Sequence, residues 1–218
     1  MIKILFIIFV LLGVALLLLN EQLKIFNLWK ECKYDELEKY YEEIVDKQVE
    51  NSVNKLCVLT SLFGLYLLQE KLDKARNCLQ NIEKINSKDN IEFYLNLSYL
   101  LIKEKKYDEA ENVINSSLDK LNFFTNHYRI LFLNNLVEIK YKTNRVEDAK
   151  EILDSLLLKD RCNSLLLTTQ ADLYFNQCDY INAKLSYKKA LKFINRNILF
   201  LQLKKHINDK LTEIESFN

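Results

Sequence analysis

Four short stretches of this sequence repeat one pattern, in which a large apolar or aromatic residue is followed three positions later by an alanine. The four alanines, Ala75, Ala110, Ala149 and Ala183, recur at a nearly constant spacing. Self-similarity with a period of about 20 to 50 residues is typical of architectures that stack one supersecondary unit on the next. The spacing therefore predicts a chain of stacked units of about 34 residues each.

Each unit is predicted to be a pair of helices joined by a tight turn. The alanine stretches open helices with Glu and Lys on one face and apolar residues three and four positions apart on the other. Ahead of them, apolar helices are predicted over 56–69, 91–104, 127–142 and 165–177. The links inside the pairs are short and polar, and the unit around Ala149 is interpreted as one residue short in its turn. A helix-turn-helix unit of this kind predicts an α-solenoid.

The turns must be built almost without glycine or proline, since the chain has two glycines and no proline. Tight β-hairpins, and turns whose residues need φ > 0, have almost no suitable residues here. Glycine-rich loops that hold phosphate groups are excluded for the same reason. The composition therefore favours an all-α fold with short polar turns.

Charge and residue spacing exclude several classes of function. The net charge of +1 provides no basic field, so no nucleic-acid partner is expected. No two of the five cysteines lie close enough in sequence to form a zinc or redox pair, and they are interpreted as packing residues; whether Cys57 and Cys78 meet stays open. His127 and His206 are interpreted as structural. We expect no catalytic residue, no metal ligand, no cofactor and no small-molecule substrate, and an enzyme ranks third among the functions considered.

The N-terminus carries a predicted membrane segment. Residues 4–19 form an uninterrupted run of uncharged residues, about 24 Å long as a helix and slightly short of a hydrocarbon core of about 30 Å. A cleaved signal peptide is the alternative, but no Ala, Gly, Ser or Thr lies between Leu16 and Asn51 to serve a cleavage site. We therefore expect a retained single-pass anchor in the cell membrane. The lysines that follow favour a cytoplasmic repeat domain, and an extracytoplasmic domain is the alternative.

The units resemble tetratricopeptide repeats. That motif places small residues where the two helices of a repeat cross, and aromatic or large apolar residues toward the next repeat. The last unit matches it closely, with small or aromatic residues at Ala171, Tyr174, Ala183, Tyr187 and Ala190. The resemblance implies close helix crossings at the small residues.

The resemblance also predicts two local details. Gly64 maps next to the tight crossing of its helix pair. Asn122 and Asn195 stand where relatives often have proline, so helices are expected to end there on an Asn in the left-handed conformation.

We therefore expect an all-α chain: an N-terminal transmembrane helix, a tetratricopeptide-like α-solenoid of about five helix-turn-helix repeats, and a C-terminal capping helix. The predicted boundaries are 1–20 for the anchor, 21–53 for a degenerate first repeat, 54–90, 91–124, 125–162 and 163–196 for the other repeats, and 197–218 for the cap. The apolar stripe of the last segment supports capping, and a partner-binding amphipathic helix is the alternative.

The resemblance extends to small bacterial proteins in which an N-terminal anchor precedes such repeats, and it implies a scaffold that binds a protein or peptide. The alternative is an extracytoplasmic, membrane-tethered protein of chaperone-like function that attends protein export. In this family the first helix of each repeat forms the concave binding face, with Tyr99 and Phe175 as anchor candidates here. The candidate groove residues are Thr60, Leu67, Glu92, Leu95, Tyr99, Ile102, Lys103, Leu165, Thr168, Asp172, Phe175 and Asn176.

Overall fold

The computed structural model of this chain is all-helical in the residues that it describes, which are 23–25, 27, 28, 30–47, 53–85, 91–122, 125, 128–194 and 201–216. The helices are α2 (Tyr34–Lys47), α3 (Val53–Leu68), α4 (Leu72–Ile85), α5 (Ile91–Lys103), α6 (Tyr107–Asp119), α7 (Arg129–Lys142), α8 (Val146–Lys159), α9 (Ser164–Asn176), α10 (Tyr180–Phe193) and α11 (Leu201–Ser216). The predicted all-α class and the helical pairs are confirmed.

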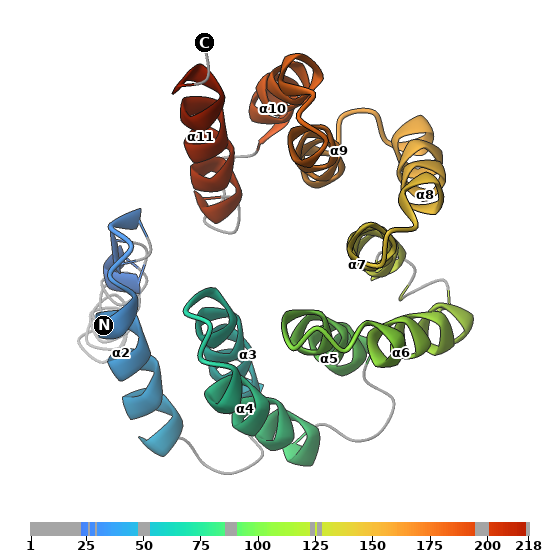
Figure 1. The fold of residues 1–218 in the computed structure, drawn as a ribbon. Helices are drawn as coiled ribbons and strands as arrows, with labels where there is room; N and C mark the ends of the chain where they lie inside the picture. The colour runs from blue at the N-terminus through green and yellow to red at the C-terminus, as the bar shows by residue number, and fades with distance from the viewer. Residues whose placement is uncertain are drawn as a thin grey trace, which may run out of the picture.

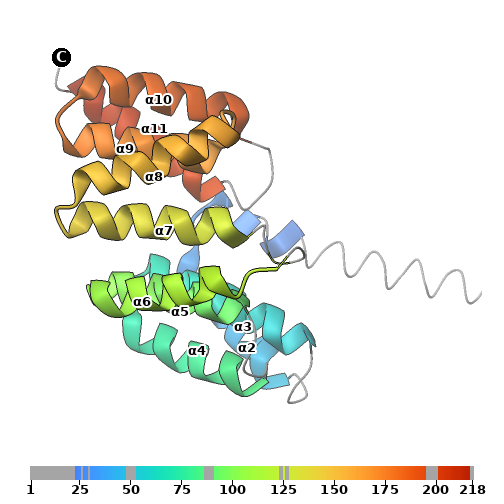
Figure 2. The ribbon, with the colours of Figure 1, turned by 90° about the vertical axis from the view of Figure 1, so that its right-hand side faces the viewer.

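The helices form a stack of pairs that curves almost into a ring (Figures 1 and 2). Helices α3, α5, α7 and α9 line the inside of the curve, and α4, α6, α8 and α10 lie on the outside (Figure 1). Apolar side chains fill the space between neighbouring helices in a series of clusters along the chain. The curvature brings α11 close to the segment that precedes α2.

The turn inside each pair is three residues long, and its middle residue has a positive φ. The φ values are 57° at Glu70, 61° at Lys105, 63° at Asn144 and 61° at Cys178, and Cys32 before α2 has φ 55°. The expectation that turns with φ > 0 would be missing was therefore wrong.

A recurrent hydrogen bond stabilises these left-handed turns without glycine. The N–H of the residue after the left-handed one donates to the carbonyl oxygen five residues earlier, as from Lys106 to Leu101 at 2.9 Å. This is the helix-ending arrangement that satisfies otherwise unpaired carbonyl groups. It offsets a left-handed cost of about 1–2 kcal/mol for a residue with a Cβ atom.

Two further expectations about chain reversals were wrong. The turn before Ala149 is three residues long, as in the other pairs, so this unit does not have a shortened turn. Asn122 is not among the described residues with positive φ. Its side-chain oxygen instead accepts the N–H of Thr125 at 3.1 Å and closes a local turn. Asn195 lies outside the described residues.

The repeated alanines lie where the helices of each pair cross. All four are fully buried, and so are Ser98 and Ala171, the small residues of the helices that they face. Gly64 differs, because a Cβ atom at this residue would meet nothing within 4 Å. Gly64 follows the buried Phe63 directly, and its own Cα faces open space where the next pair carries Tyr99.

Charged side chains on the second helices join successive pairs. Glu38 on α2 contacts Lys71 at 2.6 Å and Lys74 at 2.5 Å, and Arg76 on α4 pairs with Glu104. A third set of contacts joins Glu111 on α6 to Arg145 at 2.5 Å and to Lys140 at 2.6 Å. In each case a turn residue of the following pair takes part, so these contacts hold the pairs in register.

Helix α11 follows the last pair and buries Ile207 and Ile214 against α9 and α10. It packs as the first helix of a further pair would, and the boundaries 197–218 of the cap stay a prediction. The predicted anchor at 1–20 lies outside the described residues. Among the residues that are described, no helix has the length and apolar character needed to cross a membrane.

Candidate functional site

The candidate groove residues lie on α3, α5 and α9, which line the inside of the curve (Figure 1). Three of them are not accessible there, because Leu95, Ile102 and Thr168 are at most 5% exposed. The two apolar side chains pack in the cluster between α5, α6 and α7, and the Thr168 hydroxyl donates to the carbonyl of Ser164 at 2.7 Å. These three residues support the solenoid rather than present a surface.

The other candidates keep some exposure. Lys103 and Asn176 are exposed at the ends of their helices, and Glu92 and Tyr99 are half-buried on α5. The remaining half-buried candidates outside the α11 contact are Thr60, Leu67 and Leu165. The accessible part of the predicted site is therefore centred on α5 and its neighbours.

Helix α7 also contributes to this face, although the sequence reasoning assigned no groove residue to it. Because the turn between α7 and α8 has the normal length, α7 aligns with α5 of the preceding pair. The positions of Leu95, Tyr99 and Ile102 on α5 then correspond to Asn134, Glu138 and Tyr141 on α7. The assumption of a short turn hid this register. Applying the interval between Ala110 and Ala149 to Tyr99 would have identified Glu138.

Tyr99 and Glu138 form the most distinctive pair on the inner face. Burial raises the pKa of Tyr99 to about 12, and the nearby Glu138 carboxylate adds to the shift. Glu138 is half-buried, and within the described part of the chain no hydrogen bond or ion pair satisfies its carboxylate. A partly desolvated carboxylate without a cation is unfavourable, so a positively charged group from a partner would be stabilised here.

Asp172 and Phe175, at the other end of the inner face, already have contacts with α11. The Tyr187 hydroxyl donates to Asp172, and His206 Nε2 lies 2.8 Å from the same carboxylate oxygen. The Lys210 ammonium lies 4.0 Å from the ring centroid of Phe175. Asp172 therefore raises the pKa of His206 above its ordinary value. These two candidates dock the cap, which the sequence reasoning did not foresee.

Polar side chains between the inner helices connect one pair to the next. Asn135 donates to Ser98 at 3.0 Å, and Thr169 donates to Asn134 at 2.7 Å. Both bonds cross between inner helices of successive repeats. They fix the spacing of the inner face, because each polar group would be costly to leave unpaired.

The described residues contain no cluster of three or more metal-ligating side chains. All five cysteines are free thiols, with Cys57 exposed and Cys78 buried. Burial raises the pKa of the Cys78 thiol to about 12, so it is protonated at neutral pH and unsuited to act as a nucleophile.

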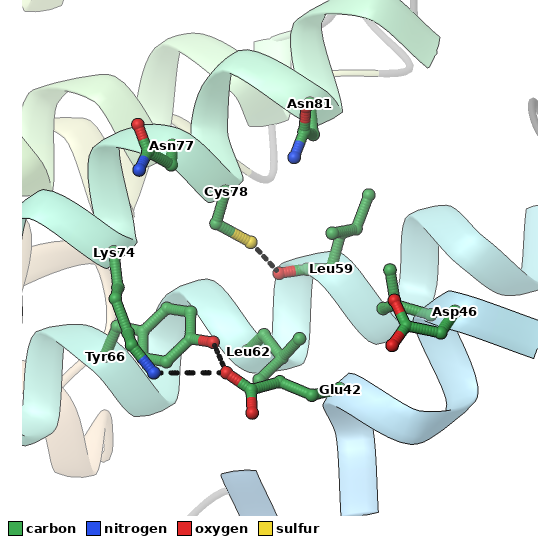
Figure 3. A pocket seen from close by; sticks show the side chains of 10 residues that line it. Glu42, Asp46, Leu59, Leu62, Tyr66, Lys74, Asn77, Cys78 and Asn81 are labelled. Carbon is green, nitrogen blue, oxygen red and sulfur yellow. Dashed lines mark hydrogen bonds and ion pairs between the residues drawn. The ribbon is translucent and has the colours of Figure 1, made fainter. Parts of the chain in front are cut away.

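A cavity of about 210 Å³ lies between α2, α3 and α4 (Figure 3). One of its charged groups, Glu42, accepts hydrogen bonds from Tyr66 at 2.8 Å and from Lys74 at 3.2 Å, and Cys78 donates to the carbonyl of Leu59 at 3.1 Å. These bonds join all three helices across the cavity. We interpret it as a packing feature of the first repeats.

Comparison with known proteins supports the fold. A crystal structure of a tetratricopeptide repeat protein from Parabacteroides merdae is similar over 87% of this chain and 68% of that chain, with a TM-score of 0.67 and 15% identity. At this identity the likeness shows the fold alone, and it confirms the resemblance to tetratricopeptide repeats. No protein-family model matches the sequence, and comparison with curated proteins finds no match.

Two other solved structures are more loosely similar. PilF of Pseudomonas aeruginosa has 17% identity and a TM-score of 0.46, over 84% of this chain and 90% of that chain. BtubC of P. vanneervenii has 15% identity and a TM-score of 0.44, over 86% of this chain and 87% of that chain. These values are too low to add to the comparison.

Proposed function

We propose that this protein is a membrane-anchored scaffold that binds a protein or peptide partner on the inner face of α3, α5 and α7. The observation that carries the proposal is the pair Tyr99 and Glu138. An aromatic ring with a polar tip and an unpaired carboxylate, side by side on the concave side of a repeat solenoid, supply an apolar contact and a charge contact to one ligand. The end of the inner face near α9 is not part of this surface, because Asp172 and Phe175 are already in contact with α11.

The membrane anchor in this proposal is the apolar segment at 4–19. Its unbroken run of uncharged residues has the hydrophobicity that a bilayer requires of a span, and the lysines that follow favour a cytoplasmic scaffold. Five free thiols agree with a reducing compartment. An extracytoplasmic, chaperone-like domain is the second candidate. A reporter enzyme fused after Asn218, active on only one side of the membrane, distinguishes the two.

The binding surface is tested by cross-linking in cells. The full chain is compared with the double variant Tyr99→Ala and Glu138→Gln, and captured proteins are identified by mass spectrometry. We expect specific partners of the wild type to be lost from the double variant. A matched control, Glu109→Gln with Glu151→Gln, changes two exposed carboxylates on the outer helices and should capture the same partners as the wild type.

Unchanged capture by a correctly folded double variant would contradict the proposal. Circular dichroism of each variant establishes that it is folded. Should the purified chain instead turn over a small molecule and capture no protein, the enzyme interpretation would replace the scaffold.

A further inference from the structure

The segment before α2 and the helix α11 meet at a seam that closes the curve (Figures 1 and 2). The Tyr34 hydroxyl and the Gln202 side-chain amide lie within hydrogen-bonding distance, at 2.8 and 3.0 Å. The Lys205 ammonium donates to the Cys32 sulfur at 3.4 Å. We define the seam as these four residues together with the cavity beside them.

A cavity of about 290 Å³ lies in this seam, bounded by both sides of it. In the part of the chain that the structure describes, every lining residue other than the cysteine carries a charged or amide group, and the aliphatic stems of the lysines add apolar surface. The lining residues are Lys30, Cys32, Gln202, Lys204, Lys205, Asn208 and Asp209. The volume lies just below the range for small-ligand sites, about 300 to 1,000 Å³. A ligand that fits it is therefore small and polar.

The charge around the cavity is positive. The residues that line the cavity carry three ammonium groups, of Lys30, Lys204 and Lys205, and one carboxylate, of Asp209. In the described part of the chain neither Lys30 nor Lys204 forms an ion pair. The bond to Cys32 raises the pKa of Lys205, so this lysine keeps its charge at neutral pH. An anion bound beside these lysines would gain charge-assisted hydrogen bonds from their ammonium groups.

We propose that this cavity binds the phosphate group of a small anionic ligand. The ammonium groups supply compact positive charges, which suit phosphate oxygens. The side-chain amides of Gln202 and Asn208 supply neutral hydrogen-bond donors beside them. The ligand would contact lysines on both sides of the seam, so its binding would stabilise the closed curve.

Two sources of such a phosphate fit the position of the cavity. Lys30 follows closely after Leu19, the last residue of the proposed anchor. An anionic phospholipid headgroup at the membrane surface is one source, since juxtamembrane lysines attract such lipids. A soluble phosphate ester is the other. The proposal does not depend on the inner face or on any protein partner.

The test measures the thermal stability of the full chain in neutral detergent micelles at constant ionic strength. Inorganic phosphate is titrated in one arm, and a short-chain phosphatidylglycerol is titrated in the other. We expect the melting temperature to rise with ligand concentration. In the double variant Lys30→Gln and Lys204→Gln, the apparent Kd should increase roughly 30-fold, as expected for the loss of two lysine contacts. Both lysines are exposed, so the variant should fold normally.

The matched control is Lys188→Gln with Lys192→Gln, which removes the same charge from exposed positions on α10 and should behave as the wild type. A response to phosphatidylglycerol alone identifies the ligand as a headgroup, and a response that includes inorganic phosphate identifies a soluble-anion site. The proposal is overturned if neither probe raises the melting temperature, or if the double variant and the control respond equally.

Discussion

Two kinds of contact join successive repeats in this molecule, and they separate an N-terminal part from a C-terminal part. Up to the turn between α7 and α8, ion pairs with weakly exposed carboxylates, such as Glu104 and Glu111, connect each pair of helices to the next. Beyond this turn the pattern changes. Lys150 pairs within its own helix with Glu147. The cap is held by the contact between Asp172 and His206, together with an ion pair to the largely exposed Glu215.

The two parts differ in whether the charges that hold them together titrate near neutral pH. The contacts with Arg145 and Lys140 hold the pKa of Glu111 below its ordinary value, although burial acts in the opposite direction. Both sides of this contact therefore stay charged through the neutral range. The contact of His206 depends on a side chain that titrates near neutral pH. The N-terminal repeats are therefore held by permanent charges, and the docking of α11 depends in part on a charge that pH controls.

The largest expected effect tests whether both parts share the same helix crossing. Ala183→Leu should overpack the contact between α9 and α10 and lower the free energy of unfolding by about 1–3 kcal/mol, because Ala183 is fully buried. Ala110→Leu should have an effect of the same size in the N-terminal part. Chemical denaturation measures both. Lys188→Leu, at an exposed position of α10, is the control and should change stability by less than about 0.5 kcal/mol. If Ala183→Leu left the free energy of unfolding unchanged, this would contradict the placement of Ala183 at a close crossing of α9 and α10.

The second prediction removes one contact between repeats. Glu111→Gln leaves Arg145 and Lys140 without their carboxylate and should cost about 1–2 kcal/mol, between the values for an exposed ion pair and for a buried charged hydrogen bond. Glu147→Gln is the matched control, since its ion pair with Lys150 is mostly exposed and should be worth less than about 0.5 kcal/mol. Equal effects in urea denaturation would show that the contacts between repeats carry no special stability.

A smaller effect is expected at Gly64 in the N-terminal part. Its helix is regular, a Cβ atom would meet nothing within 4 Å, and its φ is not positive. Gly64→Ala should therefore stabilise the chain by about 0.4–1 kcal/mol, mainly by restricting the unfolded state. Thermal denaturation measures the change. A destabilised variant would mean that the inner face at α3 is more tightly packed than the structure indicates.

Some of these features could be predicted from the sequence, and others could not. The alanine period predicted the helix pairs, because a small residue is needed at every crossing. The interval from Ala110 to Ala149 also relates Tyr99 to Glu138, and the interval from Ala149 to Ala183 relates Asp172 to His206, so continuing the register would have found both pairs. The cavity in the seam could not be found in this way. Lys30 and Lys205 lie near opposite ends of the sequence, and the curvature that joins them is the sum of many small packing angles.

The smallest expected effect concerns pH and the C-terminal part alone. Asp172 raises the pKa of His206 in the folded chain, burial and Lys210 oppose the shift, and Asp209 supports it. Because the folded pKa is higher than the unfolded value of about 6.5, the contribution of His206 to stability is complete below that value and is lost as pH rises through the folded pKa. The effect is small because the His206 side chain is 43% exposed.

Hydrogen exchange of α11, followed across the neutral pH range after correction for the intrinsic exchange rate, checks this prediction. Protection should decrease as pH rises in the wild type, while α4 and α6 keep theirs, since their ion pairs do not titrate there. In His206→Gln the pH dependence of α11 should disappear. If α11 loses protection with pH to the same extent in the variant, or if α4 and α6 lose it as well, the two parts do not differ in the way that their contacts imply.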